Sequence, residues 1–217
     1  MTKKILVLGC SHVSGHGFED AVKGDRHSVH AWPAKIPRDF DVEVINYSAA
    51  GQSTTYCVEK LQQYSDKQSL SAIIVLLPFR VRKLMSRTLP DNTVEDVPYN
   101  LYSIGDPRWE SVMEQYQKTC FNWRVNDIDF IAYYGYFRWV SLTYNIPLWI
   151  DCTTEEDHDL LIDNGLELSM PMDWFQWCEE NNFPRLPDTH YGHEAHEQFY
   201  LQYIKPWLQE KVFAPVV

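Results

Sequence analysis

A serine close to the start of the chain has surroundings that suit a nucleophile. Ser11 follows a short aliphatic run, residues 5–8, in the sequence Gly9-Cys10-Ser11-His12. Gly9 allows a sharp turn, and a helix that begins here would supply free backbone N–H groups and the positive end of its dipole. A serine that only caps a helix would have the same surroundings, so both roles stay open at this point.

A serine hydroxyl is a weak nucleophile until a base takes its proton, so a histidine oriented by a carboxylate is needed elsewhere in the chain. Such a pair stands just before a predicted helix, in Pro187-Asp188-Thr189-His190-Tyr191-Gly192. Asp188 could fix the tautomer of the His190 imidazole and stabilise its charged form. The alternative is a capped helix start, in which Asp188 accepts backbone N–H groups and His190 is exposed.

Three short blocks of the chain together resemble a known family. Gly9-Cys10-Ser11-His12 resembles the Gly-Asp-Ser block of the SGNH (GDSL-like) hydrolases, and Asp188-Thr189-His190, followed by Gly192 and His196, resembles their C-terminal Asp-x-(x)-His block. Residues 46–53, Asn-Tyr-Ser-Ala-Ala-Gly-Gln-Ser, are similar to the family's second block. The three blocks occur in the family's order.

This resemblance implies a fold, a site and an activity. The implied fold is a three-layer α/β/α, flavodoxin-like arrangement with a parallel central sheet. The implied protein is an esterase or deacetylase with Ser11 as nucleophile, His190 as base and Asp188 as the residue that orients the base, and it needs no cofactor and no metal. The backbone N–H groups of Ser11 and Gly51 would bind the oxyanion. An acylated carbohydrate is the substrate class that the family and the aromatic-rich composition favour together.

The sequence departs from the family's pattern in two places. Cys10 replaces the Asp of the Gly-Asp-Ser block, at a position that supports the turn more than the chemistry. The family's third block, Gly-x-Asn-Asp, donates an Asn side chain to the oxyanion, and here the corresponding strand is followed by Leu77-Pro78-Phe79-Arg80. We therefore predict that Arg80 or Gln52 compensates, and we take both, together with His12, as candidate substrate-binding residues.

Two other kinds of function fit the same residues. A protein that keeps the fold without the oxyanion asparagine could be a non-catalytic binding module or a virion structural protein, and the strand at 73–77 before Arg80 looks closest to SGNH-like proteins of tailed phages. The other alternative is a metal site, for which the candidate ligands are Asp188, His190, His193 and His196. No HExxH or other recognised ligand spacing supports that site.

Hydrophobic periodicity predicts the elements that must position these residues. Short apolar runs predict strands at 3–8, 42–47, 72–77 and 147–152. Helical spacing predicts a short irregular helix at 28–39 and helices at 54–64, 172–180 and 192–212, the last kinked by Pro206. This alternation predicts a parallel sheet covered by helices on both faces. We predict one domain over 1–217, with an inserted helical or lid segment at about 86–144 whose aromatic side chains lie mostly in the core.

The composition excludes several classes of function. A net charge of −11 and a pI near 5.1 oppose binding to nucleic acid, which needs clustered Lys and Arg. No stretch approaches the ~20 apolar residues that span a bilayer, and the N-terminal apolar run ends too early, at Gly9, for an export signal. Five scattered cysteines favour reduced thiols over disulfides. We expect a cytoplasmic protein without a membrane anchor, virion-associated if phage-encoded, and we leave its oligomeric state open.

Overall fold

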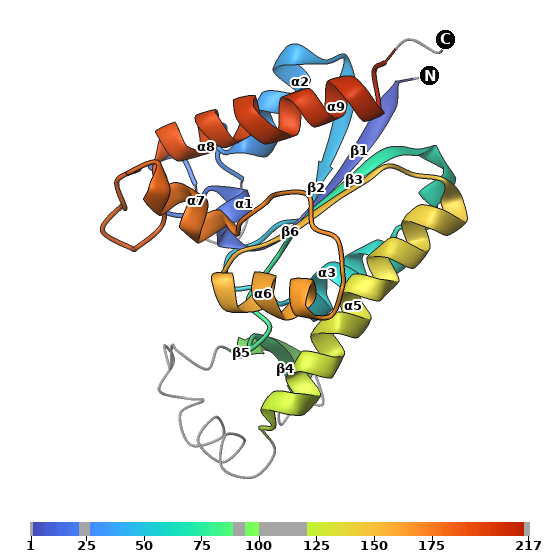
Figure 1. Cartoon of the computed structure of the whole chain (residues 1–217), viewed down its shortest axis with the longest axis vertical. Helices are drawn as coiled ribbons and strands as arrows, with labels where there is room; N and C mark the ends of the chain where they lie inside the picture. The colour runs from blue at the N-terminus through green and yellow to red at the C-terminus, as the bar shows by residue number, and fades with distance from the viewer. Residues whose placement is uncertain (1, 22–26, 89–93, 100–120, 215–217) are drawn as a thin grey trace.

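A parallel sheet forms the centre of the molecule. The structure is a computed structural model that describes residues 2–21, 27–88, 94–99 and 121–214. Its main sheet has four parallel strands in the order β2-β1-β3-β6 (Figure 1). The strands are β1 (Lys3–Leu8), β2 (Val42–Asn46), β3 (Leu70–Leu77) and β6 (Leu148–Cys152). All four predicted strands and the α/β class are therefore confirmed.

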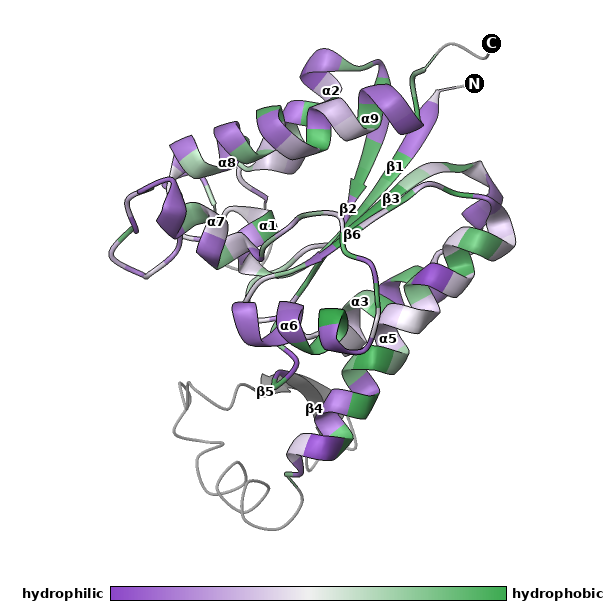
Figure 2. Cartoon of the chain, viewed as in Figure 1, coloured by the Kyte–Doolittle hydropathy of each residue, from purple (hydrophilic) through white to green (hydrophobic). Residues whose placement is uncertain are grey.

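Both faces of this sheet are buried, which explains why its strands are continuously apolar. Successive side chains of a strand point to opposite faces. In β1, Ile5 and Val7 pack into one hydrophobic cluster, whereas Leu6 and Leu8 pack into a second one on the other face. The strands of the sheet are coloured mostly as hydrophobic, whereas the helices around them carry both hydrophilic and hydrophobic residues (Figure 2).

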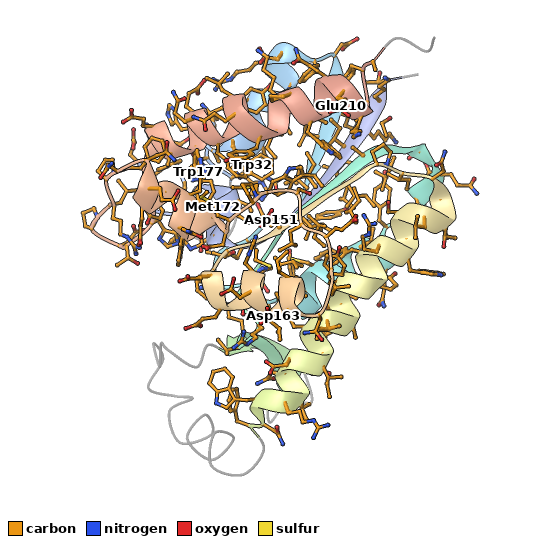
Figure 3. All side chains as sticks on the ribbon, viewed as in Figure 1. Trp32, Asp151, Asp163, Met172, Trp177 and Glu210 are labelled. Carbon is orange, nitrogen blue, oxygen red and sulfur yellow. The ribbon has the colours of Figure 1, made fainter. Side chains whose placement is uncertain are left out.

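One face of the sheet is covered by short helices from both ends of the chain. They are α1 (Ser11–Ser14), α2 (Ile36–Asp39), α7 (Trp174–Glu180), α8 (His193–Phe199) and α9 (Lys205–Lys211). Aromatic rings fill this layer: Phe199 lies 4.7 Å from Trp174, 5.6 Å from Trp149 and 5.7 Å from Trp32, between ring centroids. Figure 3 shows Trp32 and Trp177 beneath α8. The N-terminal and C-terminal segments are thus held together by a shared core.

The other face is covered by α3 (Thr54–Gln63), α5 (Trp123–Tyr144) and α6 (Glu155–Asp163). The helix α5 buries Phe130, Tyr134, Phe137 and Val140 against the sheet. It precedes β6 in the chain and forms a structural layer of the fold.

The segment predicted as an insertion, 86–144, contains both strands and a helix. Its first part contains an antiparallel hairpin of β4 (Lys83–Thr88) and β5 (Val94–Tyr99), which the turn-rich sequence did not predict. Its last part is α5, and the aromatic side chains are split between core and surface, with Phe137 fully buried and Trp139 56% exposed. Residues 89–93 and 100–120 of this segment lie outside the described residues.

The predicted C-terminal helix is interrupted before its proline. A π-helical turn, Tyr200–Ile204, separates α8 from α9, and Pro206 is the second residue of α9. A proline has no N–H to donate and its ring crowds the preceding turn, so the irregular turn just before Pro206 is the expected response.

Among the described residues, no helix is long and apolar enough to cross a membrane. Cys10, Cys57, Cys152 and Cys178 are all buried free thiols, as predicted for these four positions.

Candidate active site

Ser11 begins the first helix, directly after the turn that follows β1. Its side chain is only 3% exposed, and Cys10 is the N-cap residue of α1. As the first residue of a helix, Ser11 has a backbone N–H without an intrahelical acceptor. The turn needs Gly9, because a Cβ there would lie 2.3 Å from Cγ2 of Val13 and 3.1 Å from the carbonyl oxygen of Leu76.

His190 and Asp188 form a local pair in the loop before α8. The Asp188 Oδ2 atom lies 3.2 Å from Nδ1 of His190, and Asp188 Oδ1 accepts the backbone N–H of His190 at 3.2 Å. The Nδ1 contact is close, but its angles are not those of an aligned hydrogen bond. Thr189 between them has a left-handed backbone, with φ of 73°, which lets both side chains turn to the same side.

This pair lies against the segment that carries Ser11. The His190 ring centroid is 4.6 Å from that of His12 and 5.3 Å from that of His16. Gly17 packs on the Asp188 carboxylate so closely that a Cβ on Gly17 would lie 2.3 Å from Asp188 Oδ2. Residues separated by almost the whole chain therefore lie side by side here, and the joint role of Ser11, His190 and Asp188 stays a prediction.

Burial keeps the central imidazoles neutral. The pKa of His190 is below its usual value, because desolvation outweighs the opposing effect of the Asp188 carboxylate. The pKa of His12 is well below its usual value, first through burial and then through the charges of His190 and Arg82. A neutral His190 can accept a proton at neutral pH, as a general base must.

The second block, residues 46–53, contributes a tight loop after β2. The Asn46 carbonyl oxygen Oδ1 accepts both the N–H and the hydroxyl of Ser48, at 2.9 and 2.7 Å. The backbone N–H of Ala49 donates to the carbonyl of Gly9 at 3.4 Å, which ties this loop to the turn before Ser11. Gly51 has a φ of 76°, a conformation that glycine adopts without strain. The Oε1 atom of Gln52 is buried without a hydrogen-bond partner among the described residues.

Arg80, a predicted substrate contact, has a guanidinium that is already engaged. Its Nη1 donates to Asp157 Oδ1 at 3.1 Å and to the carbonyl of Glu156 at 2.8 Å. Its Nε lies 3.2 Å from Asp127 Oδ1. These partners lie on α5 and α6, so Arg80 links the two helices, and its contact with a substrate stays a prediction.

A second arginine, which the sequence reasoning missed, faces the site instead. The carbonyl of Phe79 accepts the N–H of Arg82 at 3.0 Å, and the resulting turn places the Arg82 guanidinium 4.3 Å from the Phe79 ring centroid. The Phe79 ring in turn lies 6.3 Å from that of His12. Arg82 Nε and Nη1 are buried and have no hydrogen-bond partner among the described residues. The sequence offers Arg80 and Arg82 as a pair but does not tell which of them faces the site.

The metal cluster predicted as an alternative does not form. His196 is buried and accepts the backbone N–H of Trp32 at its Nδ1, 3.3 Å away, and burial lowers its pKa to about 3. His193 lies near Glu19 and His30, not near the Asp188–His190 pair. The spacing of His190, His193 and His196 at every third residue suggested a shared metal site, but the fold places each of these histidines beside different residues.

A pocket of about 220 Å³ opens elsewhere, between α2 and β2. His27, Pro33, Val44 and Asn46 are among its lining residues, and Ser11, Asp188 and His190 are not. This pocket is therefore separate from the Asp188–His190 pair and Ser11.

Comparison with known proteins supports the fold. No family model and no curated protein matches the sequence. Among solved structures, TesA matches with a TM-score of 0.54 and 10% identity over 95% of this chain and 98% of that one. The psychrotrophic esterase EstA from Pseudoalteromonas sp. matches with a TM-score of 0.50 and 12% identity, over 96% and 100% of the two chains.

A further match is a carbohydrate esterase whose active site is described as displaying divergent catalytic and non-catalytic binding functions. Its TM-score is 0.51 at 11% identity, over 96% of this chain and 69% of that one. Together these structures show that the chain has the α/β fold of SGNH lipases and esterases over nearly its full length. They give the resemblance to phage proteins no support.

Proposed function

We propose that the chain is a serine esterase of the SGNH type, with Ser11 as nucleophile, His190 as general base and Asp188 as the residue that orients the base. The observation that carries this proposal is the position of the Asp188–His190 pair against α1, with the His190 ring 4.6 Å from that of His12, the residue after Ser11. A hydrolytic triad consists of a carboxylate, an imidazole and a serine in this order, and the carboxylate and the imidazole are in contact here.

In each half of the reaction, one proton passes through His190. His190 takes the Ser11 proton as Oγ attacks the ester carbonyl, and it then gives that proton to the leaving alcohol as the C–O bond breaks. Water adds to the acyl-enzyme while His190 takes its proton, and the acid leaves as Ser11 regains a proton. Asp188 stabilises the imidazolium formed in each half of the cycle.

The negative charge on the carbonyl oxygen needs donors. Ser11 and Gly51 supply backbone N–H groups, as the resemblance implies. In place of the family's asparagine we assign Arg82, because its buried Nε and Nη1 atoms have no hydrogen-bond partner within the described part of the chain and its charge acts on His12. Gln52, whose Oε1 also has no partner there, and His12 border the same region as substrate contacts.

The substrate we favour is an acylated carbohydrate. Aromatic rings flank the site, with Phe175 at 4.9 Å and Phe79 at 6.3 Å from the His12 ring centroid. Such rings give flat apolar surface for a sugar or a short acyl group. The structural likeness to a carbohydrate esterase points in the same direction.

Hydrolysis of p-nitrophenyl acetate and of an acetylated xylo-oligosaccharide tests the proposal. We expect turnover by the wild type, loss of it by about 10³-fold or more in Ser11→Ala and His190→Ala, and near-normal turnover in Ser14→Ala. Ser14 is a matched control, because it is a buried serine of the same short helix. Turnover that persists in Ser11→Ala would refute the assignment.

The second candidate function is a non-catalytic carbohydrate-binding module. It is favoured by the absence of an asparagine after β3, where Pro78-Phe79-Arg80 stands. Calorimetry separates the two functions. The protein is a binder if the folded wild type binds the acetylated oligosaccharide but hydrolyses neither substrate. The Ser11→Ala variant should then bind the oligosaccharide as well as the wild type does.

A further inference from the structure

Three side chains outside the triad gather at the junction between the two ends of the chain. Glu19 and His30 come from the segment between α1 and α2, and His193 is the first residue of α8. One ligand atom from each lies within 4.8 Å of the other two. Among the described residues this is the one group of three or more His, Cys, Asp or Glu side chains that converges in this way.

The two imidazoles are arranged face to face. The rings of His30 and His193 are stacked, with centroids 4.3 Å apart and planes 14° from parallel. His193 Nε2 also lies 3.5 Å from Glu19 Oε2. Two histidines and one carboxylate are a common ligand set for zinc sites that leave a coordination position open.

The separations suit a metal ion after small side-chain movements. With Zn–N bonds of 2.0–2.1 Å, ligand atoms around a tetrahedral ion lie about 3.3 Å apart. The Glu19–His193 contact is already near this value. Because the lone pair of an imidazole lies in the plane of its ring, the two stacked rings must also turn toward the ion. The side chains of His193 and Glu19 are 42% and 76% exposed, so both are free to change rotamer.

The surrounding residues hold the two histidines in place. The Phe18 ring packs edge-on against His193, with centroids 4.2 Å apart. Asp20, next to Glu19, is not available as a ligand, because its carboxylate accepts the Ser28 hydroxyl at 2.6 Å and the Val29 N–H at 2.7 Å. These two bonds fix the turn that presents His30.

We infer that Glu19, His30 and His193 form a binding site for a divalent transition-metal ion of the zinc type. The ion would join the segment after α1 to the start of α8, three residues beyond His190. Its chemical role is therefore to brace the contact between the two ends of the chain. The inference does not depend on the esterase proposal, because it concerns ligands that the triad does not use.

Titration of the purified, metal-free full-length chain with Zn²⁺ and with Co²⁺ tests the site. We expect one ion per chain by calorimetry, a higher melting temperature with Zn²⁺, and the intense visible absorption of Co²⁺ in a tetrahedral environment. Substituting a residue that only supports a ligand typically weakens metal binding 10–100-fold, so losing a ligand should cost at least about tenfold. His30→Ala and His193→Ala should both show that loss, and Glu19→Gln should weaken binding as well.

His27→Ala is the matched control, because His27 lies in the same segment and its Nε2 contacts the Ser48 carbonyl instead of the cluster. It should bind the ion as the wild type does. Circular dichroism confirms that each variant is folded before titration. A folded wild type that binds no ion, or binding that His30→Ala and His193→Ala leave unchanged, would overturn the inference.

Discussion

Replacing Gly17 with alanine should damage both catalysis and stability, through two separate effects. Gly17 has a φ of 92°, and it packs directly on the Asp188 carboxylate. An added Cβ would lie 2.9 Å from the carboxyl carbon of Asp188. Non-bonded carbon atoms rest about 3.5–4.0 Å apart, so the carboxylate must retreat by about 0.6–1.1 Å.

The size of the effect follows from this displacement. A misplacement of about 1 Å in a catalytic constellation can reduce turnover by about 10²-fold, which is about 2.7 kcal/mol in activation free energy. Separately, an alanine with this positive φ should lower the free energy of unfolding by about 1–3 kcal/mol. The variant should therefore be folded but less stable, and slow on p-nitrophenyl acetate.

Gly165→Ala separates the two effects. Gly165 also has a positive φ, of 74°, but nothing lies within 4 Å of a Cβ placed there. It should lose a similar amount of stability in urea unfolding while keeping wild-type turnover. If Gly17→Ala kept full turnover with the same loss of stability, the packing of Gly17 on Asp188 would have no catalytic importance.

Four further predictions concern His190, Asp188, Arg82 and α5. The pH profile of kcat/KM should fall on the acid side with a midpoint below 6.5, because the His190 pKa is lowered. Asp188→Asn should move that midpoint to still lower pH, since the carboxylate raises this pKa, and an upward shift would contradict the pairing. Arg82→Met should lower kcat by about 10²–10³-fold without unfolding the protein, whereas unchanged kcat would exclude Arg82 as an oxyanion donor. Phe137→Ala should destabilise the chain by about 3–5 kcal/mol in urea unfolding and Trp139→Ala by less than about 0.5 kcal/mol, and equal losses would exclude α5 as a core layer.

The parts of the fold that the sequence could predict are those fixed by local pattern. The strand Leu70–Leu77 is apolar on both faces, so its place inside a parallel sheet follows from composition alone. The turn at Gly9 and the loop around Asp188 follow from residue type in the same way. The proximity of the Asp188–His190 loop to the segment after β1 was expected because the two blocks resemble a known family, and not because spacing along the chain implies a contact.

The sequence could not predict the direction in which individual arginine and histidine side chains point. Arg80 and Arg82 are two residues apart, yet the turn after β3 sends one to the carboxylates of Asp157 and Asp127 and the other toward His12. The histidines after Asp188 diverge in the same manner. His193 meets Glu19 across the fold, a contact that no local spacing encodes.

Covalent labelling tests directly whether Ser11 is the nucleophile. A serine-directed phosphonate, incubated with the folded wild type at pH 8, should add one label that mass spectrometry locates on Ser11, and His190→Ala should react far more slowly. A folded wild type that stays unlabelled, or that carries the label on another serine such as Ser14 or Ser48, would contradict the account.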